Sequence, residues 1–73
     1  MKYKFYNMGG KLMWSCPHEG NGSPLETVTA IQLLFSNFPS PPPDESIVQV
    51  GSTPEGMEQW SVGPFDVLVQ KEQ

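Results

Sequence analysis

The sequence predicts a single small α+β domain over residues 1–73, in which one α-helix packs on a mainly antiparallel sheet of four or five strands. Apolar and polar residues alternate near both ends of the chain, one amphipathic stretch lies between them, and glycines and prolines separate the segments. Because the strands gather on either side of a single helix rather than alternating with helices, antiparallel pairing is favoured. The expected element order is ββα-ββ(β).

Residues 1–16 are predicted to form a β-hairpin. Tyr3 and Phe5 stand in an alternating run, and the alternation returns from Leu12 to Cys16, which is the period of two that strands show. Between the two runs, residues 7–10 (Asn-Met-Gly-Gly) tolerate the positive φ that a tight reversal needs.

Residues 23–38 are predicted to form the helix. Ser23 is expected to cap it by accepting a hydrogen bond from the Glu26 amide, while the Glu26 carboxylate reaches back to the Ser23 amide, and Pro24 fits the first turn. Pro39 disfavours helical geometry at the preceding residue and so ends the helix. The residues on the predicted core-facing stripe are Val28, Ile31, Leu34, Phe35 and Phe38.

A proline-rich crossover at residues 39–45 follows the helix, and three consecutive prolines favour an extended polyproline conformation there. Residues 46–70 contain two or three strands rich in β-branched and aromatic residues. Thr53-Pro54-Glu55-Gly56 is typical of a type I turn between the first two of these strands. Gly63-Pro64 predicts either a second turn or a bulge within one long strand.

The predicted core consists of aromatic and aliphatic side chains from all these elements. A chain of 73 residues buries only roughly 60% of its unfolded surface, so a few large side chains must supply most of the burial. The residues predicted to form the core are Tyr3, Phe5, Leu12, Trp14, Val28, Ile31, Leu34, Phe35, Phe38, Val48, Val50, Trp60, Val62, Val67 and Val69.

Composition favours a cytoplasmic protein without a membrane segment. The chain has no apolar run long enough to span a bilayer and no apolar leader. One cysteine allows no internal disulfide, which suits a reducing compartment. The formal charge is −4, from eight carboxylates and four lysines without arginine, and this disfavours nucleic acids as partners.

The only neighbouring thiol and imidazole in the chain belong to Cys16 and His18. A zinc site needs three or four protein ligands, so we expect no metal and no other cofactor. A thiol-dependent enzyme or redox protein that uses Cys16 and His18 is kept as the alternative function. The continuation of the Leu12 and Trp14 face favours Cys16 as a small buried apolar residue.

The function that these observations favour is protein–protein interaction, as an adaptor or inhibitor without catalysis of its own. The partner is expected to be another protein or a second copy, bound through an open sheet edge or an acidic surface. The candidate binding residues are the two tryptophans, as aromatic anchors, and three carboxylates: Trp14, Trp60, Glu55, Glu58 and Asp66.

A further alternative is weak binding of single-stranded nucleic acid. It would use lysines near the N-terminus together with strand-borne tyrosines, namely Lys2, Lys4, Lys11, Tyr3 and Tyr6. The sequence Pro39-Ser40-Pro41-Pro42 also matches the P-x-x-P pattern of polyproline ligands, but the arginine that usually flanks such ligands is absent.

Overall fold

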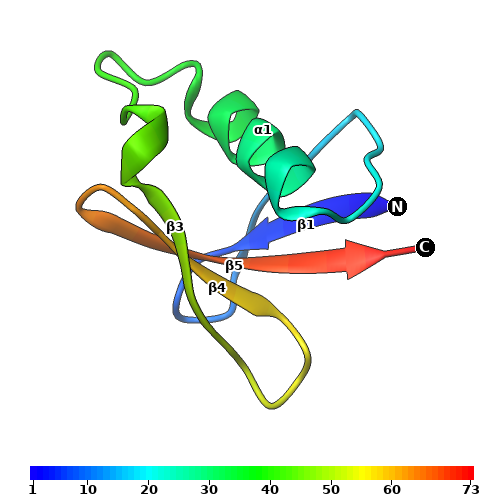
Figure 1. Ribbon diagram of the computed structural model, residues 1–73. Helices are drawn as coiled ribbons and strands as arrows, with labels where there is room; N and C mark the ends of the chain where they lie inside the picture. The colour runs from blue at the N-terminus through cyan, green and yellow to red at the C-terminus, as the bar shows by residue number, and fades with distance from the viewer.

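In the computed structural model, which describes all 73 residues, five strands form one antiparallel sheet and α1 lies across one face of it (Figure 1). The strand order is β2-β1-β5-β4-β3. The predicted α+β class and the ββα-βββ order are therefore confirmed. The elements are β1 (Lys2–Tyr6), β2 (Leu12–Ser15), α1 (Pro24–Phe35), the 3₁₀ helix η1 (Asp44–Ser46), β3 (Ile47–Ser52), β4 (Glu58–Val62) and β5 (Phe65–Glu72).

The last strand joins the two halves of the sheet. β5 pairs with β1 on one side and with β4 on the other, and the register with β1 places Lys2 opposite Glu72. The two chain termini consequently lie close together (Figure 1). This pairing between distant segments closes the domain. Neither helix has the length and apolar character that a membrane crossing requires.

Gly63-Pro64 forms a two-residue turn between two separate strands. Val62 and Phe65 face each other across the β4–β5 pair, and Gly63 has a φ of 62°. Only glycine adopts that region without a steric penalty at the first position of such a reversal. Of the two alternatives that the sequence left open, the turn is the correct one.

The helix begins as predicted, but only half of the expected reciprocal cap forms. The Glu26 amide donates to Ser23 Oγ at 3.3 Å. The Ser23 amide donates to Asn21 Oδ1 at 2.9 Å, so the predicted return bond from the Glu26 carboxylate is wrong. The preceding asparagine satisfies this donor locally, as Asn side chains do in turns.

The helix ends at Phe35, three residues earlier than predicted. The Ser36 amide donates to the Leu33 carbonyl at 3.3 Å, and the Ser36 hydroxyl donates to the same carbonyl at 2.8 Å. The Phe38 amide then bonds to the Phe35 carbonyl at 3.1 Å. These bonds span three residues rather than four, so the chain leaves the α-helix before the proline segment.

The core lies between α1 and the covered face of the sheet. Thr27 is also fully buried, and its hydroxyl donates to the Ser23 carbonyl at 2.9 Å. Half-buried Trp14, Val28 and Leu34 pack against the core from its margins. The buried residues that form it are Tyr3, Phe5, Ala30, Ile31, Phe35, Ile47, Trp60, Val62, Val67 and Val69.

Four residues that were predicted to be buried are exposed: Leu12, Phe38, Val48 and Val50. Leu12 and Val48 lie opposite Tyr6 and Ser61, on the sheet face that α1 does not cover. Phe38 follows the early end of the helix. The core prediction was wrong at these positions because it assumed a longer helix and did not include the strand order.

Each of the two edge strands carries one extra residue, and in β3 this extra residue is the exposed Val50. In β3, Gln49 faces Trp60 and Gly51 faces Gln59, which leaves Val50 without a cross-strand partner. Met13 is the corresponding extra residue of β2. Such bulges interrupt the regular row of backbone donors and acceptors along an edge and oppose edge-to-edge pairing.

Candidate functional site

Both tryptophans that were predicted as binding anchors take part in packing. The Trp14 ring is half-buried and stacks on Phe5 with centroids 5.9 Å apart. Trp60 is only 3% exposed, and its indole N–H donates to Glu58 Oε1 at 2.9 Å. A ring as buried as that of Trp60 offers almost no area to a partner.

The three predicted carboxylates are not brought together. Glu55 is exposed in the turn between β3 and β4, and Asp66 is exposed near the start of β5. The side chain of Glu58 is bound to Lys71 Nζ at 2.7 Å. By their register Glu58 and Asp66 point to opposite faces of the sheet. They therefore do not form one acidic surface.

Cys16 and His18 lie away from any cavity. Cys16 is half-buried, packs against the core, and donates its backbone N–H to the Tyr3 carbonyl at 2.9 Å. His18 is exposed in the loop that follows. No three residues of the His, Cys, Asp and Glu types come together in a group that could hold a metal ion.

Several of the residues that were predicted to bind nucleic acid make contacts within the domain instead. Tyr3 is 2% exposed, and its hydroxyl accepts a hydrogen bond from the Gly22 amide at 3.0 Å, so its ring is not free to stack on a base. Lys4 forms an ion pair with Glu72 at 3.2 Å. Tyr6 donates its hydroxyl to Gln70 Oε1 at 3.0 Å.

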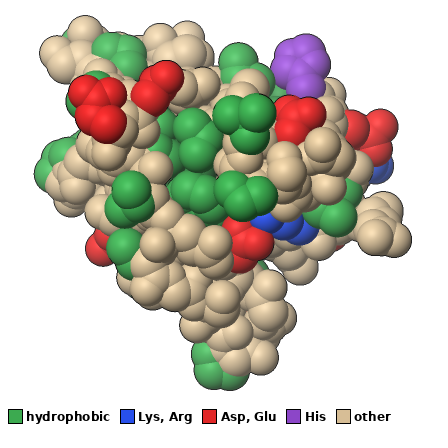
Figure 2. Space-filling view, viewed as in Figure 1, with side chains coloured by type: hydrophobic (Ala, Val, Ile, Leu, Met, Phe, Trp, Pro, Cys, Tyr) green, Lys and Arg blue, Asp and Glu red, His purple; other side chains and the backbone are tan.

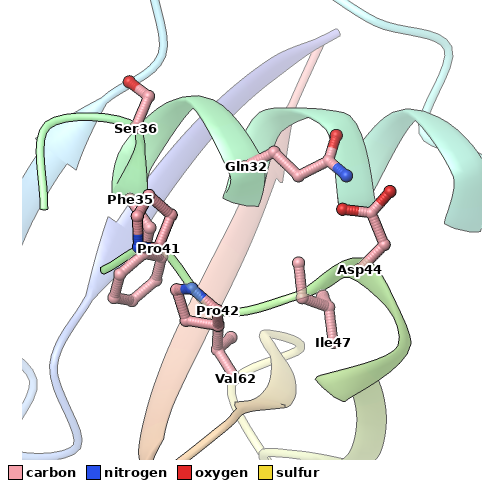
Figure 3. Close-up of a pocket in the computed structure, with 8 residues that line it drawn as sticks. All are labelled: Gln32, Phe35, Ser36, Pro41, Pro42, Asp44, Ile47 and Val62. Atoms are coloured by element: carbon pink, nitrogen blue, oxygen red, sulfur yellow. The ribbon is translucent and has the colours of Figure 1, made fainter. Parts of the chain in front are cut away.

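A pocket of about 310 Å³ lies at the C-terminal end of α1 (Figure 3). This volume is at the lower end of the range of roughly 300–1,000 Å³ for ligand pockets. Its walls come from four parts of the chain: α1 and the residue after it, the proline segment with the start of η1, β3, and β4. The lining residues are Gln32, Phe35, Ser36, Pro41, Pro42, Asp44, Ile47 and Val62.

The interior of the pocket is apolar and its rim is polar. Phe35, Ile47 and Val62 belong to the buried core, and Pro42 is half-buried beside them. Pro41 and Pro42 form one wall of the pocket, and prolines are suited to this because their rings restrict the backbone. Asp44 is exposed at the rim. An apolar group of a ligand in the pocket would therefore contact side chains of the core directly.

Gln32 and Asp44 supply the polar end of the pocket. Their side chains extend from α1 and η1 toward each other (Figure 3). Neither the Gln32 amide nor the Asp44 carboxylate takes part in any hydrogen bond or ion pair within the chain. Both groups are therefore free to bind a ligand. The exposed Glu45 follows Asp44 and adds a second negative charge nearby.

Three phenylalanines form what we call the aromatic cluster: Phe35, Phe38 and Phe65. The ring centroid of Phe35 lies 4.8 Å from that of Phe38 and 5.9 Å from that of Phe65. Phe38 and Phe65 are 40% and 48% exposed. Since Phe35 also lines the pocket, the cluster and the pocket adjoin each other.

Acidic and hydrophobic side chains meet beside α1. In the space-filling view, hydrophobic side chains gather in the middle of the visible face, and acidic side chains lie over η1 at their edge (Figure 2). Gln32, Phe65 and Asp44 are binding candidates that were not predicted from the sequence. The sequence shows that Asp44 directly follows three prolines. It does not show that Asp44 lies near Gln32, because that proximity depends on how the crossover folds back along α1.

The polar side chains of the pocket lining are Gln32, Ser36 and Asp44. Asp44 is its only titratable lining residue, and the Ser36 hydroxyl donates to the Leu33 carbonyl instead of to a base. Comparison of the chain with protein-family models, with curated proteins and with solved structures found no match.

Proposed function

We propose that this protein is an interaction module, an adaptor or inhibitor, that binds another protein through the aromatic cluster and the adjoining pocket. The observation that carries the proposal is the exposure of two phenylalanines packed on a third that lines the pocket. Aromatic side chains are enriched in the cores of protein interfaces, where they bury large areas at a low cost in conformational entropy.

The composition of this surface supports a protein partner. Phe38 and Phe65 lie next to a cavity with apolar walls, and the exposed carboxylate of Asp44 stands at its rim. An apolar centre with a polar rim is the usual arrangement of a protein interface. A partner side chain placed in the pocket would be desolvated there, which is the environment of most binding hot spots.

Edge-to-edge strand addition is less favoured than binding at this surface. The extra residues Met13 and Val50 interrupt the two free edges. A strand added to such an edge loses regular backbone hydrogen bonds at the bulge. We accordingly place the partner at the aromatic cluster, and we place the protein in the cytoplasm because its single cysteine allows no internal disulfide.

The test is affinity purification with the double variant F38A/F65A beside the wild type, followed by measurement of the affinity for each purified candidate partner. Both side chains are substantially exposed, so the double variant is expected to stay folded. We expect the affinity to fall at least tenfold, because we propose these two phenylalanines as hot spots of the interface, and truncation of a hot-spot residue costs about 2 kcal/mol or more.

Leu25→Ala is the matched control. Leu25 is 77% exposed at the opposite end of α1, so its truncation removes a comparable apolar group from outside the proposed surface. The control should bind like the wild type. A partner that binds F38A/F65A as tightly as the wild type, or that is lost in L25A alone, would show that the interface lies elsewhere.

A further inference from the structure

We infer that the residue which the partner places in the pocket is basic, an arginine or a lysine, with its aliphatic stem between the apolar walls and its cation at Asp44 and Gln32. The inference rests on the proposed function, because it names the chemistry of the partner at the same surface. It is carried by the combination of an apolar cavity with an unpaired carboxylate at one end.

The shape and lining of the pocket match such a side chain. Arginine and lysine have apolar stems that favour contact with apolar surface, while their charged heads remain at the rim. Pro42, Ile47 and Val62 provide the apolar contact. The opening of the pocket to solvent beside Asp44 lets the cation stay partly hydrated, which lowers the cost of its desolvation.

The charges around the pocket favour a cation over a neutral or acidic group. None of the eight lining residues is basic. Two of the four lysines are already paired, Lys4 with Glu72 and Lys71 with Glu58. The Asp44 carboxylate is unpaired, and Glu45 beside it adds to the negative potential. An acidic ligand would be repelled by both carboxylates.

The hydrogen-bonding groups at the rim also match. The Gln32 amide offers a carbonyl oxygen, and the Asp44 carboxylate offers two oxygens. Lysine brings three N–H donors and arginine five, with no acceptors. Figure 3 shows these two side chains directed toward the same end of the pocket, so one cationic head can be reached by both.

The first measurement is a selection of peptides from a random library by the wild type and by D44N. Asp44→Asn removes the charge and keeps the size of the side chain. The wild type is expected to enrich peptides that carry arginine or lysine beside an apolar residue, and D44N is expected to lose that preference for basic residues. E19Q is the matched control, because Glu19 is an exposed carboxylate in the loop before α1 and does not line the pocket; it should keep the preference.

The second measurement is the affinity of one selected peptide and of its analogue with citrulline in place of arginine, or acetyl-lysine in place of lysine. Citrulline retains the length of the arginine side chain without its charge, and acetyl-lysine retains the aliphatic stem of lysine without its charge. Because Asp44 is exposed, we expect a loss of about 1.4-fold to fivefold, which corresponds to the roughly 0.2–1 kcal/mol that solvent-accessible ion pairs give. D44N should bind the charged and neutral peptides equally.

The outcomes separate the two proposals. Enrichment of peptides without a basic residue, with binding that F38A/F65A abolishes, would overturn the basic side chain and leave the interaction surface standing. A basic preference that D44N retains would place the cation elsewhere and would also overturn the inference. The absence of any enriched peptide that depends on Phe38 and Phe65 would overturn both proposals.

Discussion

The stacking of Phe35 on Phe65, with ring centroids 5.9 Å apart, connects the C-terminal end of α1 to the turn between β4 and β5. Phe35 is buried and lines the pocket, whereas Phe65 is half-exposed beside it. One side chain of the pair therefore belongs mainly to the core and the other mainly to the proposed interface.

Truncation of the two phenylalanines is therefore predicted to lower the stability of the domain by different amounts. Truncation of a buried Phe to Ala costs about 3–5 kcal/mol, which equals the whole stability expected of a domain this small. Phe35→Ala should therefore be largely unfolded at 25 °C, while Phe65→Ala should retain a cooperative transition. Urea unfolding followed by circular dichroism measures both. Equal loss of stability in the two variants would contradict the assignment.

The helix cap predicts a moderate loss of stability for Ser23→Ala. The Ser23 hydroxyl accepts from the Glu26 amide, and removal of such a cap typically costs about 1 kcal/mol. In a domain of this size the melting temperature should fall by roughly 4–8 °C. Asn21→Ala removes the acceptor for the Ser23 amide and should cost less, because that loop donor is exposed to water. Thermal unfolding of both variants decides the order.

The partly buried contacts of Glu58 predict a difference between its alanine and glutamine variants. Glu58 accepts from the Trp60 indole N–H at 2.9 Å and from Lys71 Nζ at 2.7 Å. Glu58→Ala leaves the indole donor without a partner and should cost about 1–3 kcal/mol. Glu58→Gln keeps an acceptor for the indole and should cost about 1 kcal/mol or less. Denaturation followed by tryptophan fluorescence distinguishes them, and equal costs would mean that the indole bond contributes nothing.

A glycine in the loop before α1 is required by close packing. A Cβ atom at Gly20 would lie 2.5 Å from the hydroxyl oxygen of Tyr3 and 2.7 Å from its ring. Because Tyr3 is buried, Gly20→Ala should displace it and cost about 1–3 kcal/mol. Gly51→Ala is the control, since nothing lies within 4 Å of its added Cβ. A stability of G20A equal to that of G51A would show that Tyr3 moves without cost.

The sequence was sufficient for features with local causes. The cap at Ser23 and the turn at residues 7–10 depend on residues that are close in the chain, and the Gly10 amide indeed bonds to the Asn7 carbonyl at 2.9 Å. The alternation around Tyr3 and Phe5 also marked a strand with one buried face. In each case the physical constraint acts over a few neighbouring residues, so the structure could be predicted from the residue types in that segment.

Features that depend on tertiary arrangement could not be predicted in this way. The exposure of Val48 follows from the position of β3 at the sheet edge and from its face, and neither is encoded by alternation alone. The pocket joins Gln32 of α1, Pro42 of the proline-rich crossover and Val62 of β4, which are far apart in the sequence. The packing of Phe38 on Phe65 likewise depends on where the chain turns after Ser36. Long-range geometry, rather than residue type, decided these cases.

Binding at the aromatic cluster can be mapped by the amide chemical shifts of the ¹⁵N-labelled protein during titration with a peptide selected by the wild type. We expect the largest shifts in the segments that carry Phe35 to Phe38, Asp44 to Ile47 and Phe65, and we expect these shifts to be lost in F38A/F65A. Shifts confined to β2, or to the sheet face that α1 leaves uncovered, would contradict binding at the aromatic cluster.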